Sequence, residues 1–277
     1  MLVSESTILI GLGSVLAGML GALTGLGGGI IVVPMLTVLF GVDIRYAAGA
    51  ALISVIATSS GAAAAYLKEG YTNMRIGMFL EVATTTGAIC GAALAAFVPI
   101  HLLSIIFGCT LLLSAYLTSR KKTGNTLTDK PDPIAQKLKL DGSFPSDQGI
   151  VTYHVYNVPG GFVGMWFAGL LSGLLGIGSG ALKVLAMDQV MRVPFKVSTT
   201  TSNFMIGVTA AASAGIYLHR GYVDPLLVAP VMLGVLGGAM LGAKILTVSK
   251  TSLLRTVFTY VLIILALQMI FSGVVHK

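Results

Sequence analysis

Residues 25–34 read GLGGGIIVVP, and residues 176–185 read GIGSGALKVL. Both stretches stand among long apolar segments, where closely spaced glycines weaken a continuous helix because glycine loses the most conformational freedom on folding. The stretches are 151 residues apart and carry glycines at matching positions, whereas a lysine, Lys183, is present in the second alone. The chain therefore has two equivalent points at which a helix is expected to break.

The composition is typical of a membrane protein with several spans. Of the 277 residues, 55% are hydrophobic and 10% are charged, and the mean hydropathy is +0.92. Soluble domains carry about 25% charged residues. The net charge of +7 does not indicate nucleic-acid binding, because the basic residues fall in short loops rather than on one face. Cys90 and Cys109 lie in apolar segments and are expected to be core residues.

Ten apolar segments, separated by short polar turns, are expected to be helices. Their approximate ranges are 7–24, 28–41, 44–67, 74–98, 101–119, 158–175, 179–192, 195–218, 225–248 and 252–273. Most have about the 20 residues that a helix needs to cross a hydrocarbon core of about 30 Å. The second and seventh have fourteen residues and reach only about 21 Å. Because these two start at glycines, we expect each to be one limb of a broken or re-entrant hairpin.

The two halves of the chain are copies of each other. A shift of 151 residues aligns them without a gap from Gly21 to about Leu117, so that YLKEGY at 66–71 falls on YLHRGY at 217–222. The expected organisation is a first membrane repeat at 1–119, a cytoplasmic linker at 120–157 and a second membrane repeat at 158–277. The linker is rich in proline, glycine and charge, and its end, IVTYHVY, alternates like a short strand.

The number of segments and the positive charges predict the topology. Five segments per half is an odd number, so the second copy enters the membrane from the opposite side. With the N-terminus outside, thirteen of the 17 basic residues lie on the inner side and three on the outer side, in agreement with the preference of Lys and Arg for cytoplasmic loops. The expected fold is an all-α integral membrane protein with about ten transmembrane or half-spanning helices in two inverted-topology five-segment repeats. We expect it in the cell (inner) membrane.

Helix breaks inside a membrane favour anion binding. A helix that begins there has unpaired N–H groups and roughly half a positive charge at its N-terminus, and small residues let an anion approach the backbone. Inverted repeats with broken helices are also a design of secondary transporters. The candidate substrate-binding residues at the two breaks are Gly27, Gly28, Gly29, Gly178, Ser179 and Gly180. The alternative is that these glycines serve close helix packing, which we favour for the G-x-x-x-G glycines Gly87, Gly91, Gly238 and Gly242.

Lys183 lies some three residues after the second break. A lysine inside a span costs at least about 2.5–3.5 kcal/mol on insertion scales and usually marks function. A cation beside a helix N-terminus is unfavourable unless an anion joins them, so Lys183 is a candidate ligand for anionic cargo. The alternative is a structural ion pair, for which Glu81 on another helix is better placed than Asp188, about 140° around the same helix. Glu81 is a candidate coupling or gating residue: a proton carrier if unpaired, and a gate or structural partner if paired with Lys183.

The stretch KVSTTTSNF at 196–204 adds hydroxyl and amide groups over nearly two turns of helix, and its counterpart in the first half is apolar. Such side chains in membrane helices often bond to their own backbone. A cluster of this size nevertheless favours a polar lining of the transport path. Its candidate substrate-binding residues are Ser198, Thr201, Ser202 and Asn203.

The two glycine stretches, the YLKEGY and YLHRGY turns, Asp224 after the second turn and the G-x-x-x-G after each resemble the sulfite exporter TauE/SafE family. The resemblance covers nearly the whole chain except 120–157. It implies a membrane permease that moves small sulfur-containing anions such as sulfite, sulfoacetate or other organosulfonates. Ser179 replaces a glycine of the family pattern, and Asn73 stands where an acidic residue is expected.

The sequence therefore predicts a permease, a secondary transporter that moves a small sulfur-containing or organic anion across the membrane by alternating access. An anion channel or an ion-binding membrane module is the alternative, because it would share the broken hairpins. We expect no enzyme, since Ser, Cys and His do not converge at the spacing of a nucleophile–base pair, and we expect no catalytic residue, cofactor or metal. The expected partners are a small anionic substrate and the lipid bilayer, without nucleic acid, and homo-oligomerisation stays open.

Overall fold

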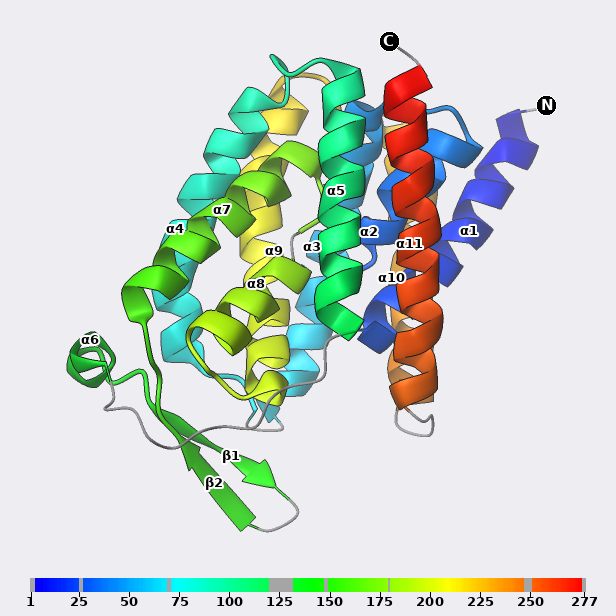
Figure 1. Cartoon of the computed structure of the whole chain (residues 1–277). Helices are drawn as coiled ribbons and strands as arrows, with labels where there is room; N and C mark the ends of the chain where they lie inside the picture. The colour runs from blue at the N-terminus through cyan, green and yellow to red at the C-terminus, as the bar shows by residue number, and fades with distance from the viewer. Residues whose placement is uncertain are drawn as a thin grey trace.

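The long apolar segments form α-helices, as the sequence predicts, and pack side by side (Figure 1). The computed structural model describes residues 3–24, 27–68, 71–119, 132–146, 149–178, 180–246 and 251–275. The long helices among them are α1 (Val3–Thr24), α3 (Ile44–Lys68), α4 (Met74–Leu94), α5 (Ile100–Ser119), α7 (Val158–Leu175), α9 (Phe195–His219), α10 (Pro225–Leu246) and α11 (Thr251–Val275).

The two short segments fold in the same way in both halves. Each is a six-residue α-helix followed by one turn of π-helix: α2 (Gly29–Pro34) with η1 (Met35–Leu39), and α8 (Gly180–Leu185) with η2 (Ala186–Val190). Proline removes a helical hydrogen bond, but the residue that matches Pro34 is Leu185. Proline is therefore not required for the π-helical turn. Both short helices begin at the predicted glycine breaks.

The packing of the helices is reciprocal between the halves. The elements α2, η1 and α3 begin and end 151 residues before α8, η2 and α9. Their contacts correspond in the same way. Helix α1 packs against α10, and the helices equivalent to these two, α7 and α4, pack against each other. At the centre, α3 packs against α9, and α5 packs against α11 (Figure 1). Each half therefore covers the apolar faces of the other.

Glycines allow these helix pairs to touch backbone to backbone. A Cβ atom at Gly91 of α4 would lie 2.0 Å from the carbonyl oxygen of Leu170, and one at Gly238 of α10 would lie 1.9 Å from that of Val15. Such contacts leave no room for a side chain, and small residues are the usual means of close helix packing in membranes. The prediction that the G-x-x-x-G glycines serve packing is confirmed for Gly87, Gly91 and Gly238.

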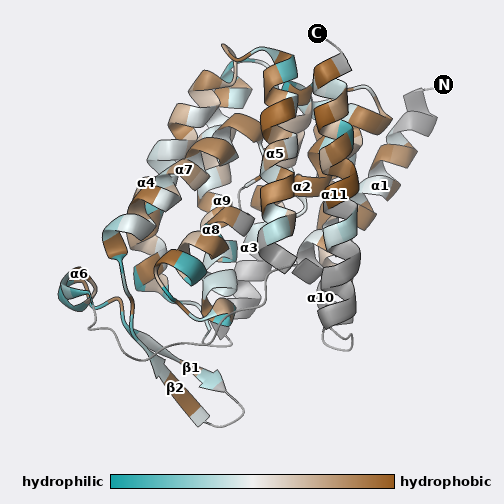
Figure 2. Cartoon of the chain, in the orientation of Figure 1, coloured by the Kyte–Doolittle hydropathy of each residue, from teal (hydrophilic) through white to brown (hydrophobic). Residues whose placement is uncertain are grey.

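The outer surface of the helices is apolar. Among the described residues, three helical stretches are long and apolar enough to cross a membrane: Met74–Leu94, Val158–Leu175 and Pro225–Gly242. Hydrophobic residues cover much of the helices' length (Figure 2), and large side chains such as Met78, Leu233 and Phe271 are at least 64% exposed. Cys90 and Cys109 are exposed as well, so the prediction that they are core residues is wrong. An apolar exterior of this kind fits contact with lipid.

The described part of the linker forms a small unit at one end of the molecule. It contains the short helix α6 (Pro133–Lys137) and an antiparallel hairpin of β1 (Gly142–Ser146) and β2 (Gly149–Tyr153). The strand predicted at the end of the linker is present, whereas α6 and β1 were not predicted. Figure 1 shows this unit at the end of the helices opposite the two chain termini.

Asn73 attaches the linker to the membrane helices. Its Oδ1 accepts from the N–H of Ile76 and caps α4, while its Nδ2 donates to the carbonyl of Leu140 at 3.0 Å and to the hydroxyl of Tyr153 at 2.7 Å. Burial raises the pKa of Tyr153, which keeps its hydroxyl protonated. An aspartate would cap α4 equally well but has no N–H for Leu140. The departure from the family pattern at this position therefore has a structural reason.

Candidate functional site

A turn at two glycines with left-handed backbone conformations places Lys183 inside the protein. Helix α7 ends at Gly176 (φ +71°), and the chain then turns through Gly178 (φ +70°) into α8. Both residues have left-handed backbone conformations that side chains disfavour. Because of this turn, α8 begins beside the end of α7, and Lys183 on α8 is 0% exposed.

Glu81 of α4 lies opposite Lys183. The distance from Lys183 Nζ to Glu81 Oε2 is 3.9 Å. Thr209 of α9 bridges the pair, since its hydroxyl oxygen accepts from Lys183 Nζ and its hydroxyl donates to Glu81 Oε1 at 2.6 Å. The structural partner predicted for Lys183 is therefore present, and it is not Asp188, whose Oδ2 accepts from Gln189.

Two further hydroxyl groups hold the Glu81 carboxylate. Thr84 donates to Oε2 and Thr85 donates to Oε1, each at 3.0 Å. A buried charge is stable only when it is paired and hydrogen-bonded, and this carboxylate has one cation and three hydroxyl groups around it. We call Lys183, Glu81, Thr84, Thr85 and Thr209 the Lys183 cluster.

The ion pair of the Lys183 cluster has no counterpart at the equivalent positions of the other half. With the 151-residue offset, Lys183 corresponds to Val32, Glu81 to Met232 and Thr209 to Thr58. Val32 is fully buried in the hydrophobic core. The duplicated helices thus carry an ion pair in one of two equivalent places, which indicates that the fold itself does not require it.

The predicted polar face of α9 divides into separate contacts. Ser198, Thr201, Ser202 and Asn203 are all buried. The Ser202 hydroxyl donates to the carbonyl of Gly180 at 3.2 Å and so joins α9 to the start of α8, close in sequence to Lys183. By contrast, Thr201 accepts from the N–H of Asn73, and Ser198 donates to the carbonyl of Val193. Of these contacts, the one from Ser202 ties α9 to the helix that carries Lys183.

The two glycine breaks meet at an apolar contact. A Cβ atom at Gly29 would lie 2.8 Å from Val55, and one at Gly178 would lie 2.9 Å from Ile206 and 3.2 Å from Val55. Val55 and Ile206 are equivalent residues of α3 and α9, and both are buried.

Gly28 packs against Val235 of α10, while Gly27 (φ +79°) forms the turn before α2. Ser179 lies outside the described residues. The role of the glycine breaks as anion ligands stays a prediction.

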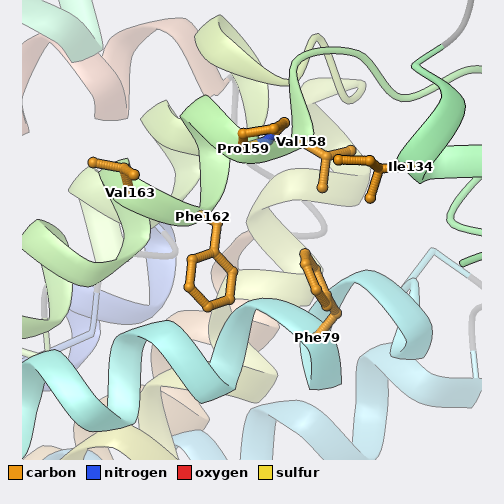
Figure 3. A pocket seen from close by; sticks show the side chains of 6 residues that line it. All are labelled: Phe79, Ile134, Val158, Pro159, Phe162 and Val163. Atoms are coloured by element: carbon orange, nitrogen blue, oxygen red, sulfur yellow. The ribbon is translucent and has the colours of Figure 1, made fainter.

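A surface groove between α4, α6 and α7 is unsuited to an anion. It has a volume of about 390 Å³ and is lined by Phe79, Ile134, Val158, Pro159, Phe162 and Val163. Figure 3 shows Phe79 and Phe162 facing each other, with ring centroids 5.4 Å apart. All six side chains are apolar, so they offer no partner for a charge. The candidate site is therefore the buried Lys183 cluster.

Thr209, which bridges Lys183 and Glu81, was missed by sequence reasoning. It lies seven residues after Ser202, which places both side chains on the same face of α9, two turns apart. This spacing was the available signal. It is weak, because Thr209 also lies within hydrogen-bonding distance of the Met205 carbonyl in its own helix, as threonines of membrane helices commonly do.

Comparison with known proteins identifies the family of the chain. The model of the family "Sulfite exporter TauE/SafE" matches residues 10–269. The probable membrane transporter protein YunE of Bacillus subtilis is 30% identical over 96% of this chain and 98% of its own length. The probable membrane transporter protein YdhB of the same organism is 29% identical over 83% of this chain and 86% of its own length. No solved structure matches the chain. The chain is therefore a membrane protein of the TauE/SafE sulfite exporter family, which is a family of membrane transporters.

Proposed function

We propose that this protein is a secondary transporter that moves a small sulfur-containing anion, such as sulfite or an organosulfonate, by alternating access. The observation that carries the proposal is the fully buried Lys183 on a short helix, held by Glu81 and Thr209. An ionisable residue inside a membrane bundle usually lies on a substrate or ion path. Membership of a transporter family supports the same assignment.

In this proposal, Lys183 binds the negative charge of the substrate. The 3.9 Å between Lys183 and Glu81 is longer than a charge-assisted hydrogen bond of about 2.8 Å, so the two groups are held in place by Thr209 rather than by direct contact. An anion that replaces Thr209 as the neighbour of the lysine Nζ brings a negative charge against the ammonium, which is a stronger partner than a neutral hydroxyl. The remaining proposed ligands are the predicted residues Gly27, Gly28, Gly29, Gly178, Ser179, Gly180, Ser198, Thr201, Ser202 and Asn203.

Glu81 is paired with Lys183 in this structure, and we propose that it acts as the coupling residue when an anion separates the pair. An anion beside Lys183 also lies near the Glu81 carboxylate, and two negative charges repel each other strongly in a medium of low dielectric constant. A proton on Glu81 removes this repulsion and leaves the threonine hydroxyl groups as partners of a neutral carboxyl. One anion and one proton therefore bind and leave together, which makes transport electroneutral for a monovalent anion.

The proposed topology is an inverted repeat in the cell membrane, with the N-terminus outside and the 120–157 linker cytoplasmic. Basic residues support it: Arg75 donates to the Lys139 carbonyl of the linker, and Arg192 lies over the ring of Tyr156. These cations thus lie at the end of the helices that carries the linker. That end is cytoplasmic by the preference of Lys and Arg for the cytoplasmic side.

Counterflow in proteoliposomes tests this function. Vesicles loaded with unlabelled sulfite or sulfoacetate are expected to accumulate the labelled anion transiently above its external concentration, because an alternating carrier exchanges one anion for another. Uptake is expected to rise when the outside is made more acidic than the inside. Lys137→Met, which removes an exposed lysine of α6, serves as the control with unchanged uptake. Flux without counterflow would contradict the carrier and favour a channel.

A further inference from the structure

Two cation–aromatic pairs join the halves of the protein. The guanidinium carbon of Arg45 lies 6.0 Å from the ring centroid of Tyr222, and Nζ of Lys196 lies 5.6 Å from the ring centroid of Tyr71. A cation within about 6 Å of an aromatic ring is attracted to its face. Arg45 and Lys196 are equivalent by the 151-residue offset, and so are Tyr71 and Tyr222. The two pairs are therefore copies of one interaction.

The two pairs lie at opposite ends of the molecule. Tyr71 also packs against Phe144 of the linker, with ring centroids 6.3 Å apart, so the Lys196–Tyr71 pair lies at the linker end. Arg45 donates to the carbonyls of Ala95 and Val98, which follow the C-terminus of α4. Helix α4 starts near the linker and has 21 residues, so the Arg45–Tyr222 pair lies about 30 Å away.

Each pair connects the start of one central helix to the end of the other. Arg45 and Lys196 lie in the first turns of α3 and α9, while Tyr222 and Tyr71 follow the last turns of α9 and α3. The pairs therefore close the interface between α3 and α9 at its two ends. The apolar contact between the glycine breaks and Val55 lies along this same interface.

The pair at the end opposite the linker has a close backbone contact beside it. A Cβ atom at Gly49 would lie 2.3 Å from the carbonyl oxygen of Tyr222, so the backbones of the two halves touch there. Tyr222 also packs against Tyr46 and Tyr217, with ring centroids 5.7 and 6.1 Å apart. The residue equivalent to Gly49 is Thr200, which has a side chain at that position. The linker end instead has Phe144 of the linker against Tyr71.

We propose that the two pairs are the gates of alternating access: Lys196–Tyr71 closes the path at the linker end, and Arg45–Tyr222 closes it at the opposite end. This inference rests on the proposed transport function and adds how access to the Lys183 cluster is controlled. The Arg45–Tyr222 end is supported by the backbone contact at Gly49. The linker end is supported by Phe144 against Tyr71 and by the hydrogen bond from Asn73 to Thr201.

Thiol labelling of a buried reporter tests the gates. The reporter is Ser202→Cys, placed in a background in which Cys90 and Cys109 are alanine, and a membrane-impermeant thiol reagent is added to sealed vesicles from one side at a time. Lys196→Gln is expected to raise the labelling rate from the linker side about two- to fivefold, in keeping with the strength of one exposed cation–π contact. Arg45→Gln is expected to raise labelling from the other side, because the amide lacks the positive charge that lies against Tyr222.

Tyr260→Leu serves as the control, because Tyr260 is exposed on α11 and belongs to neither pair. Tyr71→Leu and Tyr222→Leu repeat the test by removing the aromatic ring of each pair. If one variant of a pair does not fold, the other variant still tests that pair. Variants of both pairs that raise labelling from the same side, or variants of either pair that leave labelling unchanged, would overturn the gates. Labelling needs no substrate, so correct labelling of the reporter protein together with no anion uptake by the wild type would contradict the proposed function and leave the gates in place.

Discussion

The double variant Lys183→Met/Glu81→Gln is expected to keep most of the thermal stability of the wild type and to transport no anion. A buried ion pair contributes little net stability, because the cost of removing both charges from water offsets their attraction. The equivalent position in the other half already contains the apolar pair Val32 and Met232. The fold therefore accepts the loss of both charges, whereas the proposed transport does not.

The single variants are expected to behave differently from the double variant. Lys183→Met leaves the Glu81 carboxylate without its cation, and Glu81→Gln leaves a buried lysine without its anion. Removing one partner of a buried pair costs about 3–5 kcal/mol, which corresponds to a loss of about 10 °C in melting temperature for a protein of this size. Melting curves in detergent and anion uptake in proteoliposomes measure both effects. Uptake by the double variant at the wild-type rate would show that the pair is only structural.

Gly238→Ala is expected to disrupt the contact between α10 and α1, whereas Gly237→Ala is expected to be tolerated. A Cβ atom at position 238 would lie 1.9 Å from the carbonyl oxygen of Val15, while one at position 237 would meet nothing within 4 Å. The helices must separate to accept the methyl group, and overpacking of this kind costs at least about 1–3 kcal/mol. Alanine at 237 is expected to add up to about 1 kcal/mol through its higher helix propensity.

The yield of monodisperse protein and its melting temperature measure this difference. The two substitutions add the same methyl group to neighbouring residues of one helix, so helix propensity cancels in the comparison. Equal behaviour of the two variants would contradict the backbone contact between α1 and α10.

The sequence predicts the helices well because burial in lipid leaves few alternatives to a helix. Uninterrupted apolar stretches set the bounds, and the range expected for α7, 158–175, agrees with Val158–Leu175. The glycine stretches mark the turns before α2 and α8, since glycine is needed where the backbone becomes left-handed, as at Gly27 and Gly178.

Local sequence could not predict how the helices face one another. Cys90 and Cys109 lie in strongly apolar helices with little difference between their faces, so their exposure depended on which neighbours pack where. The place of Thr209 between Lys183 and Glu81 depends on three helices meeting. The reason for asparagine at position 73 could not be predicted either, because its amide donates to the carbonyl of Leu140, which is 67 residues away in the sequence.

Binding of the anion to Lys183 is tested most directly by thermal stabilisation of the purified protein with sulfite, sulfate, sulfoacetate and taurine. At a concentration of about 100 times Kd, a bound ligand adds about 2.7 kcal/mol of stability. The wild type is therefore expected to melt several degrees higher with sulfite or sulfoacetate. The folded Lys183→Met/Glu81→Gln variant is expected to show no shift. An equal shift in that variant would contradict Lys183 as the ligand of the anion.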